Sequence, residues 1–199
     1  MTKITIRSDY YNGERFFFPG SKKPLGFFDF LKALRKFERR EWPKRVESRA
    51  LPYERREPGE NEIKVTFVNH STVLLDLSGV RLLIDPIWSK RTSPIPGLGP
   101  KRVRVPGLAF SDLPKIDFVL VSHNHYDHCD IPTLKRLRRQ HDPMFIAPIG
   151  DEALFKRHGL AKVKTMDWWE EFSPLEKLAL TFLPAKHFSS RTTFDHNTS

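Results

Sequence analysis

The stretch His123-Asn124-His125-Tyr126-Asp127-His128 directly follows an apolar run at residues 118–121, which predicts a buried strand. Three imidazoles and one carboxylate therefore lie just past the end of a strand. These are the ligand types that Zn²⁺ or a comparable divalent ion takes in proteins. In an extended loop, His123 and His125 can converge on one ion. Asp127 and His128 lie farther on, at a turn, where they can reach a second ion.

The segment matches the pattern His-x-His-x-Asp-His and resembles the metallo-β-lactamase superfamily. Residues 69–75, 83–89 and 184–189 are similar to the N-acylphosphatidylethanolamine-hydrolysing phospholipase D branch and its bacterial relatives. The resemblance runs from about Tyr10 to the last residue. It implies an α/β fold, the αββα sandwich of two β-sheets with helices outside.

The resemblance implies that His187 is the third ligand of the first metal. It also implies two Zn²⁺ ions and two further ligands downstream, for which Asp195 and His196 come too soon and too close together. With only Asp127 and His128 at the second metal, we expect at most one well-coordinated site in this chain. We therefore expect an incomplete sandwich, its first half plus an N-terminal extension, which is nearly inactive alone and prone to aggregate.

Two residues are candidates for orienting the ligands from a second shell. Asp85, at a strand end before Pro86, could hold a ligand histidine, or it could be a turn carboxylate. His70 could form a hydrogen bond near the site, or it could be an ordinary core or hairpin histidine. Cys129 adjoins the motif, but the family pattern has no thiolate there. The remaining histidines are expected at the surface: His141, His158 and His196.

Two domains are predicted: a basic, aromatic extension at residues 1–60 and the metallo-β-lactamase-like domain at 61–199. The extension holds one predicted helix at 27–42, with an apolar face formed by Phe27, Phe30, Leu31, Leu34 and Phe37. We expect that face to pack on the main domain. In the main domain, strands are predicted at 63–67, 73–77, 80–84, 118–121, 144–147, 163–166 and 178–183, and helices at 131–140 and 151–158.

Charge and composition limit the classes of partner that this chain could bind. The net charge is +10, and residues through Pro58 carry 15 Lys and Arg against 8 Asp and Glu. This front end could meet an anionic membrane surface at its periphery, or it could be solvated surface; no nucleic-acid partner is expected. The chain has no long apolar run and no apolar signal-peptide core, and its single cysteine cannot form an internal disulfide. Cytoplasmic residence is therefore expected.

A dinuclear site of this kind predicts a metal-dependent hydrolase, with Asp127 as the catalytic candidate that binds a metal and holds the attacking water. By resemblance, the substrate is a lipid phosphodiester of the N-acylphosphatidylethanolamine type. A lactonase or other small-molecule hydrolase is an alternative. A second alternative is an inactive fragment that binds metal, lipid or nucleic acid. The aromatic residues Trp168, Trp169 and Phe172 are either core or a lip of the substrate site.

Overall fold

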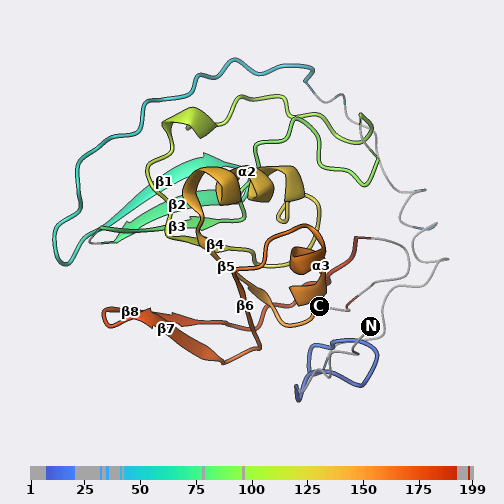
Figure 1. The fold of residues 1–199 in the computed structure, drawn as a ribbon. Coiled ribbons are helices and arrows are strands. Elements are labelled where there is room, and N and C mark those ends of the chain that lie inside the picture. The colour runs from blue at the N-terminus through green and yellow to red at the C-terminus, as the bar shows by residue number, and fades with distance from the viewer. Residues whose placement is uncertain are drawn as a thin grey trace.

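The computed structural model describes residues 8–20, 32, 35, 41, 43–77, 79–95, 97–191 and 197. A mixed six-stranded sheet has helices on one side and a two-stranded hairpin near the other (Figure 1). The elements are β1 (Ile63–Asn69), β2 (Thr72–Leu77), β3 (Val80–Ile84), the 3-10 turn η1 (Phe110–Asp112), β4 (Phe118–Leu120), α2 (Ile131–His141), β5 (Met144–Pro148), α3 (Glu152–Arg157), β6 (Val163–Met166), β7 (Glu171–Leu175) and β8 (Leu178–Thr181).

The six-stranded sheet follows the order β1-β2-β3-β4-β5-β6. Strands β1 to β3 form an antiparallel meander, and Gly79 between β2 and β3 has a φ of 85°, which glycine adopts without steric cost. Strands β3 to β6 run parallel. Parallel neighbours need crossover connections, and α2 and α3 lie in two of them. The carboxyl ends of β3, β4 and β5 therefore meet at one edge of the sheet, and the candidate site lies there.

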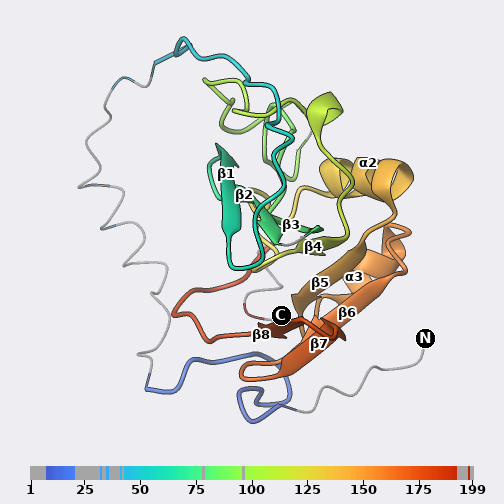
Figure 2. The same cartoon turned by 90° about the vertical axis from the view of Figure 1, so that its left-hand side faces the viewer.

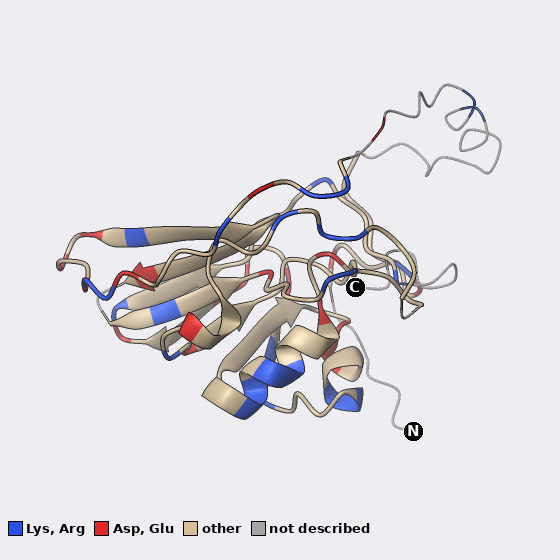
Figure 3. Cartoon of the chain, turned by 90° about the horizontal axis from the view of Figure 1, so that it is seen from above, with Lys and Arg blue, Asp and Glu red and all other residues tan. Residues whose placement is uncertain are grey.

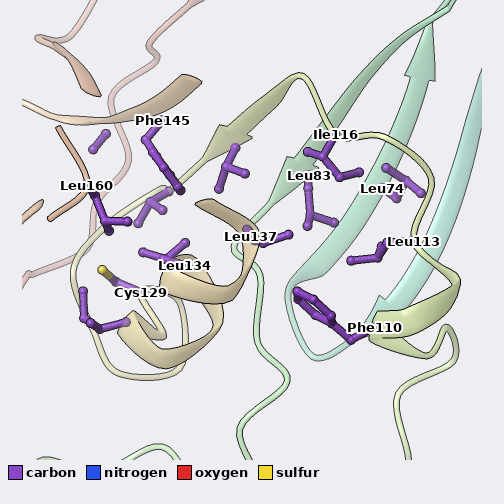
Figure 4. Packing of buried hydrophobic residues seen from close by; sticks show 14 of the residues in the cluster. Leu74, Leu83, Phe110, Leu113, Ile116, Cys129, Leu134, Leu137, Phe145 and Leu160 are labelled. Atoms are coloured by element: carbon purple, nitrogen blue, oxygen red, sulfur yellow. The ribbon is translucent and has the colours of Figure 1, made fainter. Parts of the chain in front are cut away.

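The main core lies between the sheet and the helices. Leu83 and Phe145 of the sheet pack in one cluster with Leu134 and Leu137 of α2, and all four are fully buried (Figure 4). The buried positions of α2 recur every three or four residues, as one face of a helix requires. Burying each such leucine contributes roughly 1.5–3 kcal/mol. This packing fixes the loop that joins β4 to α2.

The opposite face of the sheet is covered unevenly. Phe172 of β7 and Leu180 of β8 pack on a cluster that contains Leu82, Phe118 and Ile146. The hairpin lies beside β6, at the far end of the sheet from β1 (Figures 1 and 2). The covered cluster also includes Leu75 and Leu77 of β2, so coverage of this face stops short of β1.

Strand β1 shows the predicted alternation, but its apolar side is the exposed one. Ile63, Val65 and Phe67 are 62%, 61% and 64% exposed. Val65 lies opposite Leu75, which lies opposite Leu82, so these residues share the face that the hairpin covers only at its other end. Lys64 points to the other side, where its ammonium lies 3.5 Å from the buried carboxylate of Asp76.

Most predicted elements are present within a few residues of their expected ends. The main difference is β7, at a position where only an aromatic cluster was noted, because Pro174 inside it weakens the strand pattern. The predicted helix at 27–42 falls largely outside the described residues, including all five residues of its apolar face; Lys32 and Arg35 are helical. The division into 1–60 and 61–199 stays a prediction.

Two described segments of the front part contact the sheet domain. Tyr53 packs against the main core, and its hydroxyl donates a hydrogen bond to Asp76. Farther forward, the rings of Tyr10 and Phe18 lie with their centroids 4.7 and 5.6 Å from that of Trp168. These segments are therefore anchored to the domain through aromatic side chains.

Basic residues are spread over the surface rather than confined to the front part. Figure 3 shows Lys and Arg on the helices as well as on the loops, with Asp and Glu between them. Helix α2 alone carries Lys135, Arg136, Arg138 and Arg139. Among the described residues, no helix combines the length and the apolar character that crossing a membrane requires.

Candidate metal centre

The site is built at the shared carboxyl edge of the parallel strands. Asp85 directly follows β3, and its backbone N–H donates to the carbonyl of Leu120 at 2.8 Å. Val121, just past β4, donates to the carbonyl of Ile146 on β5, also at 2.8 Å. The loop at residues 122–129, here termed the motif loop, therefore starts from three strands held in register. This edge is where α/β sheets commonly bind ligands.

A first cluster brings together His123, His125 and His187. His123 Nε2 lies 2.8 Å from His125 Nδ1, and His187 Nε2 lies 3.3 Å from the same atom. Two ligand nitrogens on a tetrahedral Zn²⁺ at roughly 2.0–2.1 Å are separated by about 3.3 Å. The spacing and the imidazole donors therefore fit one ion of that size. The structure brings these histidines together as the spacing and the resemblance predicted, while their role as ligands stays a prediction.

A second cluster lies beside the first and consists of His70, Asp127 and His128, with one ligand atom from each within 4.8 Å of the others. His70 Nε2 lies 3.1 Å from Asp127 Oδ2, and His128 Nε2 lies 3.9 Å from the same oxygen. Only two ligands were expected here, and His70 was expected at most to form a hydrogen bond near the site. The structure places His70 as a third candidate ligand, on the turn between β1 and β2.

Asp85 holds the start and the end of the loop through hydrogen bonds. Its side chain is buried, and one oxygen accepts a hydrogen bond from the Ser122 N–H at 2.7 Å. The other oxygen lies 2.7 Å from the Ser122 hydroxyl and 2.7 Å from His128 Nδ1. Because His128 Nδ1 is occupied by this contact, its Nε2 is the atom that faces the second cluster. The positive φ of Asp85, 42°, is a conformation that Asp tolerates better than most residues.

The electrostatics of the two clusters differ. Burial, followed by the neighbouring imidazoles of His128, His125 and His187, lowers the pKa of His123 to about 4. Burial also acts to lower the pKa of His128, but the hydrogen bond and charge of Asp85 outweigh it, so that this pKa is raised. Burial acts to raise the pKa of Asp127, yet a backbone hydrogen bond and the adjacent His128 and His70 leave it lowered.

A cavity of about 530 Å³ opens beside both clusters, with His123, His128 and His187 in its wall. The rest of its lining is mainly apolar and aromatic, with Phe16, Phe17, Phe18, Met166, Trp168, Phe182, Leu183 and Phe188 among the residues. Of the predicted aromatic residues, Trp168 therefore lines the cavity, Phe172 packs under the sheet, and Trp169 is 61% exposed. Phe16, Phe17 and Phe18 belong to the aromatic extension predicted at residues 1–60, and no motif linked them to the site.

The other candidates lie apart from the clusters. Cys129 is buried, and burial raises the pKa of its thiol to about 12, which disfavours the thiolate that a metal would need. His141 is buried in the core below Phe110 rather than at the surface, so that expectation is wrong. His158 follows α3, and His196 is outside the described residues.

Residues 80–199 match the family described as "Beta-lactamase superfamily domain". An uncharacterized protein of Mycobacterium tuberculosis is 36% identical over 132 residues, which are 66% of this chain and 36% of that protein. The N-acyl-phosphatidylethanolamine-hydrolyzing phospholipase D 1 of Caenorhabditis elegans is 37% identical over 147 residues, covering 69% of this chain and 41% of that enzyme. Among solved structures, the metallo hydrolase Igni18 of Ignicoccus hospitalis is 21% identical with a TM-score of 0.49, covering 64% of this chain and 50% of that one.

The chain thus spans well under half the length of these curated relatives. The family match nevertheless covers more than half of the chain and includes the motif loop with Asp127 and His128, as well as His187. The mixed sheet with helices on one face agrees with the α/β class expected from the sequence. The chain belongs to the beta-lactamase superfamily domain family.

Proposed function

We propose that this chain carries the metal centre of a metal-dependent hydrolase that cleaves phosphodiesters with a long apolar group, in the manner of a phospholipase D acting on N-acylphosphatidylethanolamine-like lipids. The observation that carries this proposal is that two three-residue clusters lie side by side at one largely apolar cavity, with His123, His128 and His187 in its wall. The C. elegans and Saccharomyces cerevisiae relatives named as phospholipases D of this type support the substrate class.

The donor sets suit borderline divalent ions, such as Zn²⁺ or Fe²⁺, because both consist of imidazole with at most one carboxylate. When bound, such ions supply Lewis acidity and lower the pKa of water at the site. In the proposed site, His123, His125 and His187 hold the first ion, and His70, Asp127 and His128 hold the second. Two Zn²⁺ ions are our specific proposal.

The protein's own groups then position the reaction. Asp127 lies next to His70 and His128, and its lowered pKa keeps the carboxylate charged near neutral pH. A charged carboxylate there can accept a hydrogen bond from the attacking water and orient it toward the phosphorus. Asp85 keeps His128 in one orientation through its contact with Nδ1. Asp127 would therefore orient the attacking water, whereas Asp85 orients the proposed ligand His128.

The cavity favours a lipid over a small polar substrate. Its wall near the clusters is aromatic, so removing an acyl chain from water there would contribute about 25 cal/mol per Å² of buried apolar area. The phosphodiester would lie at the histidine end, with the apolar group toward Phe182 and Trp168. Basic residues on the surrounding surface would favour a peripheral contact with anionic membranes.

A small-molecule hydrolase, such as a lactonase, is the second candidate, because the same centre also suits attack at a carbonyl carbon. A lactone of a sugar acid would make little use of an aromatic wall, whereas an acyl lactone would use it. The panel of substrates must therefore vary the reacting bond and the apolar group independently.

The test is an assay of the 199-residue chain loaded with Zn²⁺, Fe²⁺ or Mn²⁺ against matched substrates. Phosphodiesters, lactones and thioesters are each presented with a long acyl chain and with an acetyl group. We expect release of phosphatidic acid from the long-chain phosphodiester to rank first, even though turnover of the chain alone is expected to be slow. Preference for a lactone would replace the proposed substrate class. Tight cation binding with no cleavage of any substrate would favour the binding-only alternative, and equal turnover by His125→Ala would refute the proposed centre.

A further inference from the structure

Arg191 links the two parts of the first cluster. It lies four residues beyond His187, in the segment at residues 185–191, here termed the third-ligand segment. Its guanidinium Nη1 donates to the carbonyl of Asn124 at 2.8 Å and to the carbonyl of Cys129 at 3.0 Å. The guanidinium carbon also lies 4.0 Å from the ring centre of Tyr126. One side chain from the third-ligand segment thus contacts three residues of the motif loop.

The two carbonyls that Arg191 contacts flank three of the candidate ligands in the loop. Asn124 lies between His123 and His125, and Cys129 follows His128, so that the two bonds hold the loop on either side of His125, Asp127 and His128. Both residues are buried, and a buried carbonyl without a donor costs about 1–3 kcal/mol. The Asn124 side chain is held separately, because its amide donates to the Asp151 carboxylate at 3.1 Å. Arg191 therefore adds a tie to a loop that is also held by Asp151, directly before α3, and by Asp85.

The chemistry of the contact favours arginine over any other residue. A guanidinium is planar, stays charged and can bond two acceptors while its face stacks on an aromatic ring. A lysine ammonium could reach one carbonyl, but it has no flat face for Tyr126. Being a cation, Arg191 does not ligate a metal ion, so its contribution to the centre must be indirect.

A second tie holds the third-ligand segment from its other side. The Ser189 N–H donates to the Asn197 side-chain oxygen at 3.1 Å, and the Asn197 N–H donates to the Ser189 carbonyl at 2.8 Å. Asn197 in turn accepts from the Phe16 N–H at 2.7 Å. Apart from its own ring contacts with the histidines, His187 is thus located by Arg191 toward the motif loop and by Ser189 toward Phe16. The Arg191 tie spans the gap between His187 and the other two histidines, and the ring contact of Phe188 with His125 at 4.7 Å spans the same gap.

From this geometry we infer that Arg191 is a positioning residue, a clamp that sets the distance of His187 from His123 and His125. The inference rests on the proposed role of His187 as a cation ligand, and it goes beyond that role by naming what places it. Without the clamp, the motif loop and the third-ligand segment would each remain folded, but the three imidazoles would no longer be held at one-ion spacing. Cation affinity should therefore fall more than stability does.

The experiment compares wild type with Arg191→Gln, Arg191→Lys and the matched control Arg139→Gln, which removes an exposed arginine of α2. Zn²⁺ affinity is measured by competition with a chromophoric chelator, and the ligand set is followed by the visible spectrum of the Co²⁺-loaded chain. We expect Arg191→Gln to weaken the first cluster about 10- to 100-fold, as loss of an outer hydrogen-bond partner does, and to change the Co²⁺ spectrum. The Zn²⁺ affinity of Arg191→Lys should lie between those of wild type and Arg191→Gln, and that of Arg139→Gln should match wild type.

A metal-free measurement separates this inference from the proposed function. Amide hydrogen exchange of residues 123–129 in the metal-free chain should rise about tenfold in Arg191→Gln and not in Arg139→Gln. Wild-type affinity and an unchanged Co²⁺ spectrum in Arg191→Gln would overturn the clamp, as would full recovery by Arg191→Lys. If wild type itself bound no cation, the proposed function would fail; increased exchange limited to the loop would still support the clamp, and unchanged exchange would end it.

Discussion

The two candidate clusters share one short loop but are completed and braced in opposite ways. The first takes its third member, His187, from the segment after β8, whereas the second takes His70 from the turn between β1 and β2. The first consists of imidazoles alone, and burial keeps His123 neutral. The second contains a carboxylate and a histidine whose pKa Asp85 raises. The six residues 123–128 can thus contribute to both clusters, but the surrounding fold determines how firmly each cluster is held.

The largest effect should come from His125→Ala, because His125 Nδ1 lies at 2.8 Å from one cluster partner and 3.3 Å from the other. Loss of this ligand should weaken the first cluster by more than the 10- to 100-fold that an outer-shell change costs, and should abolish hydrolysis. Equilibrium dialysis with metal analysis would show one fewer bound ion per chain. Unchanged stoichiometry would mean that the first cluster does not bind a cation.

His70→Ala distinguishes a ligand from a hydrogen-bond partner at the second cluster. If His70 is the third ligand, the second ion should be lost while the first stays bound, with affinity for the second falling about 100-fold or more. The control His158→Ala removes an imidazole next to α3, away from both clusters, and should bind as wild type does. Retention of both ions by His70→Ala would show that His70 is only a hydrogen-bond partner of Asp127, as the sequence predicted.

Asp85→Asn tests the brace without altering the backbone, because Asn also tolerates the positive φ found there. The amide nitrogen cannot accept the His128 Nδ1 proton, so His128 should lose its fixed orientation. Affinity for the second ion should fall about 10- to 100-fold, while the first ion is less affected. Separate titrations of the two sites with Co²⁺, read from the two spectral transitions, would measure this; an equal loss at both would show that Asp85 supports the whole loop.

The contrast between the clusters also explains what the sequence could predict. The motif loop could be located because its candidate ligands are close together in sequence and follow an apolar run, and Asp85 because it ends a neighbouring strand. His70 and Arg191 could not be given their places in the same way, since each depends on contacts across 57 or more residues, such as His70 with Asp127 and Arg191 with Cys129. Likewise, the alternation of β1 predicted a two-sided strand, but which side is covered depends on where β7 and β8 pack.

Acidification should empty the second cluster before the first. In the metal-free protein, the pKa of His123 is about 4, so that its nitrogen carries no proton at mildly acidic pH, whereas the raised pKa of His128 retains a proton there. Cation binding must displace that proton, so between about pH 7 and pH 5 the second ion should be released first. A chelator-indicator titration at several pH values measures the order of release, and release of the first ion ahead of the second would contradict the assignment.

The folding stability of the metal-free chain should depend on pH through the same two histidines, but in opposite directions. The contribution of His123 is present above its unfolded pKa of about 6.5 and is lost as the pH falls toward 4, while that of His128 is present below about 6.5 and is lost as the pH rises through its raised pKa. In Asp85→Asn, the second of these trends should disappear and the first should remain, which thermal unfolding of the metal-free chain across this range would show.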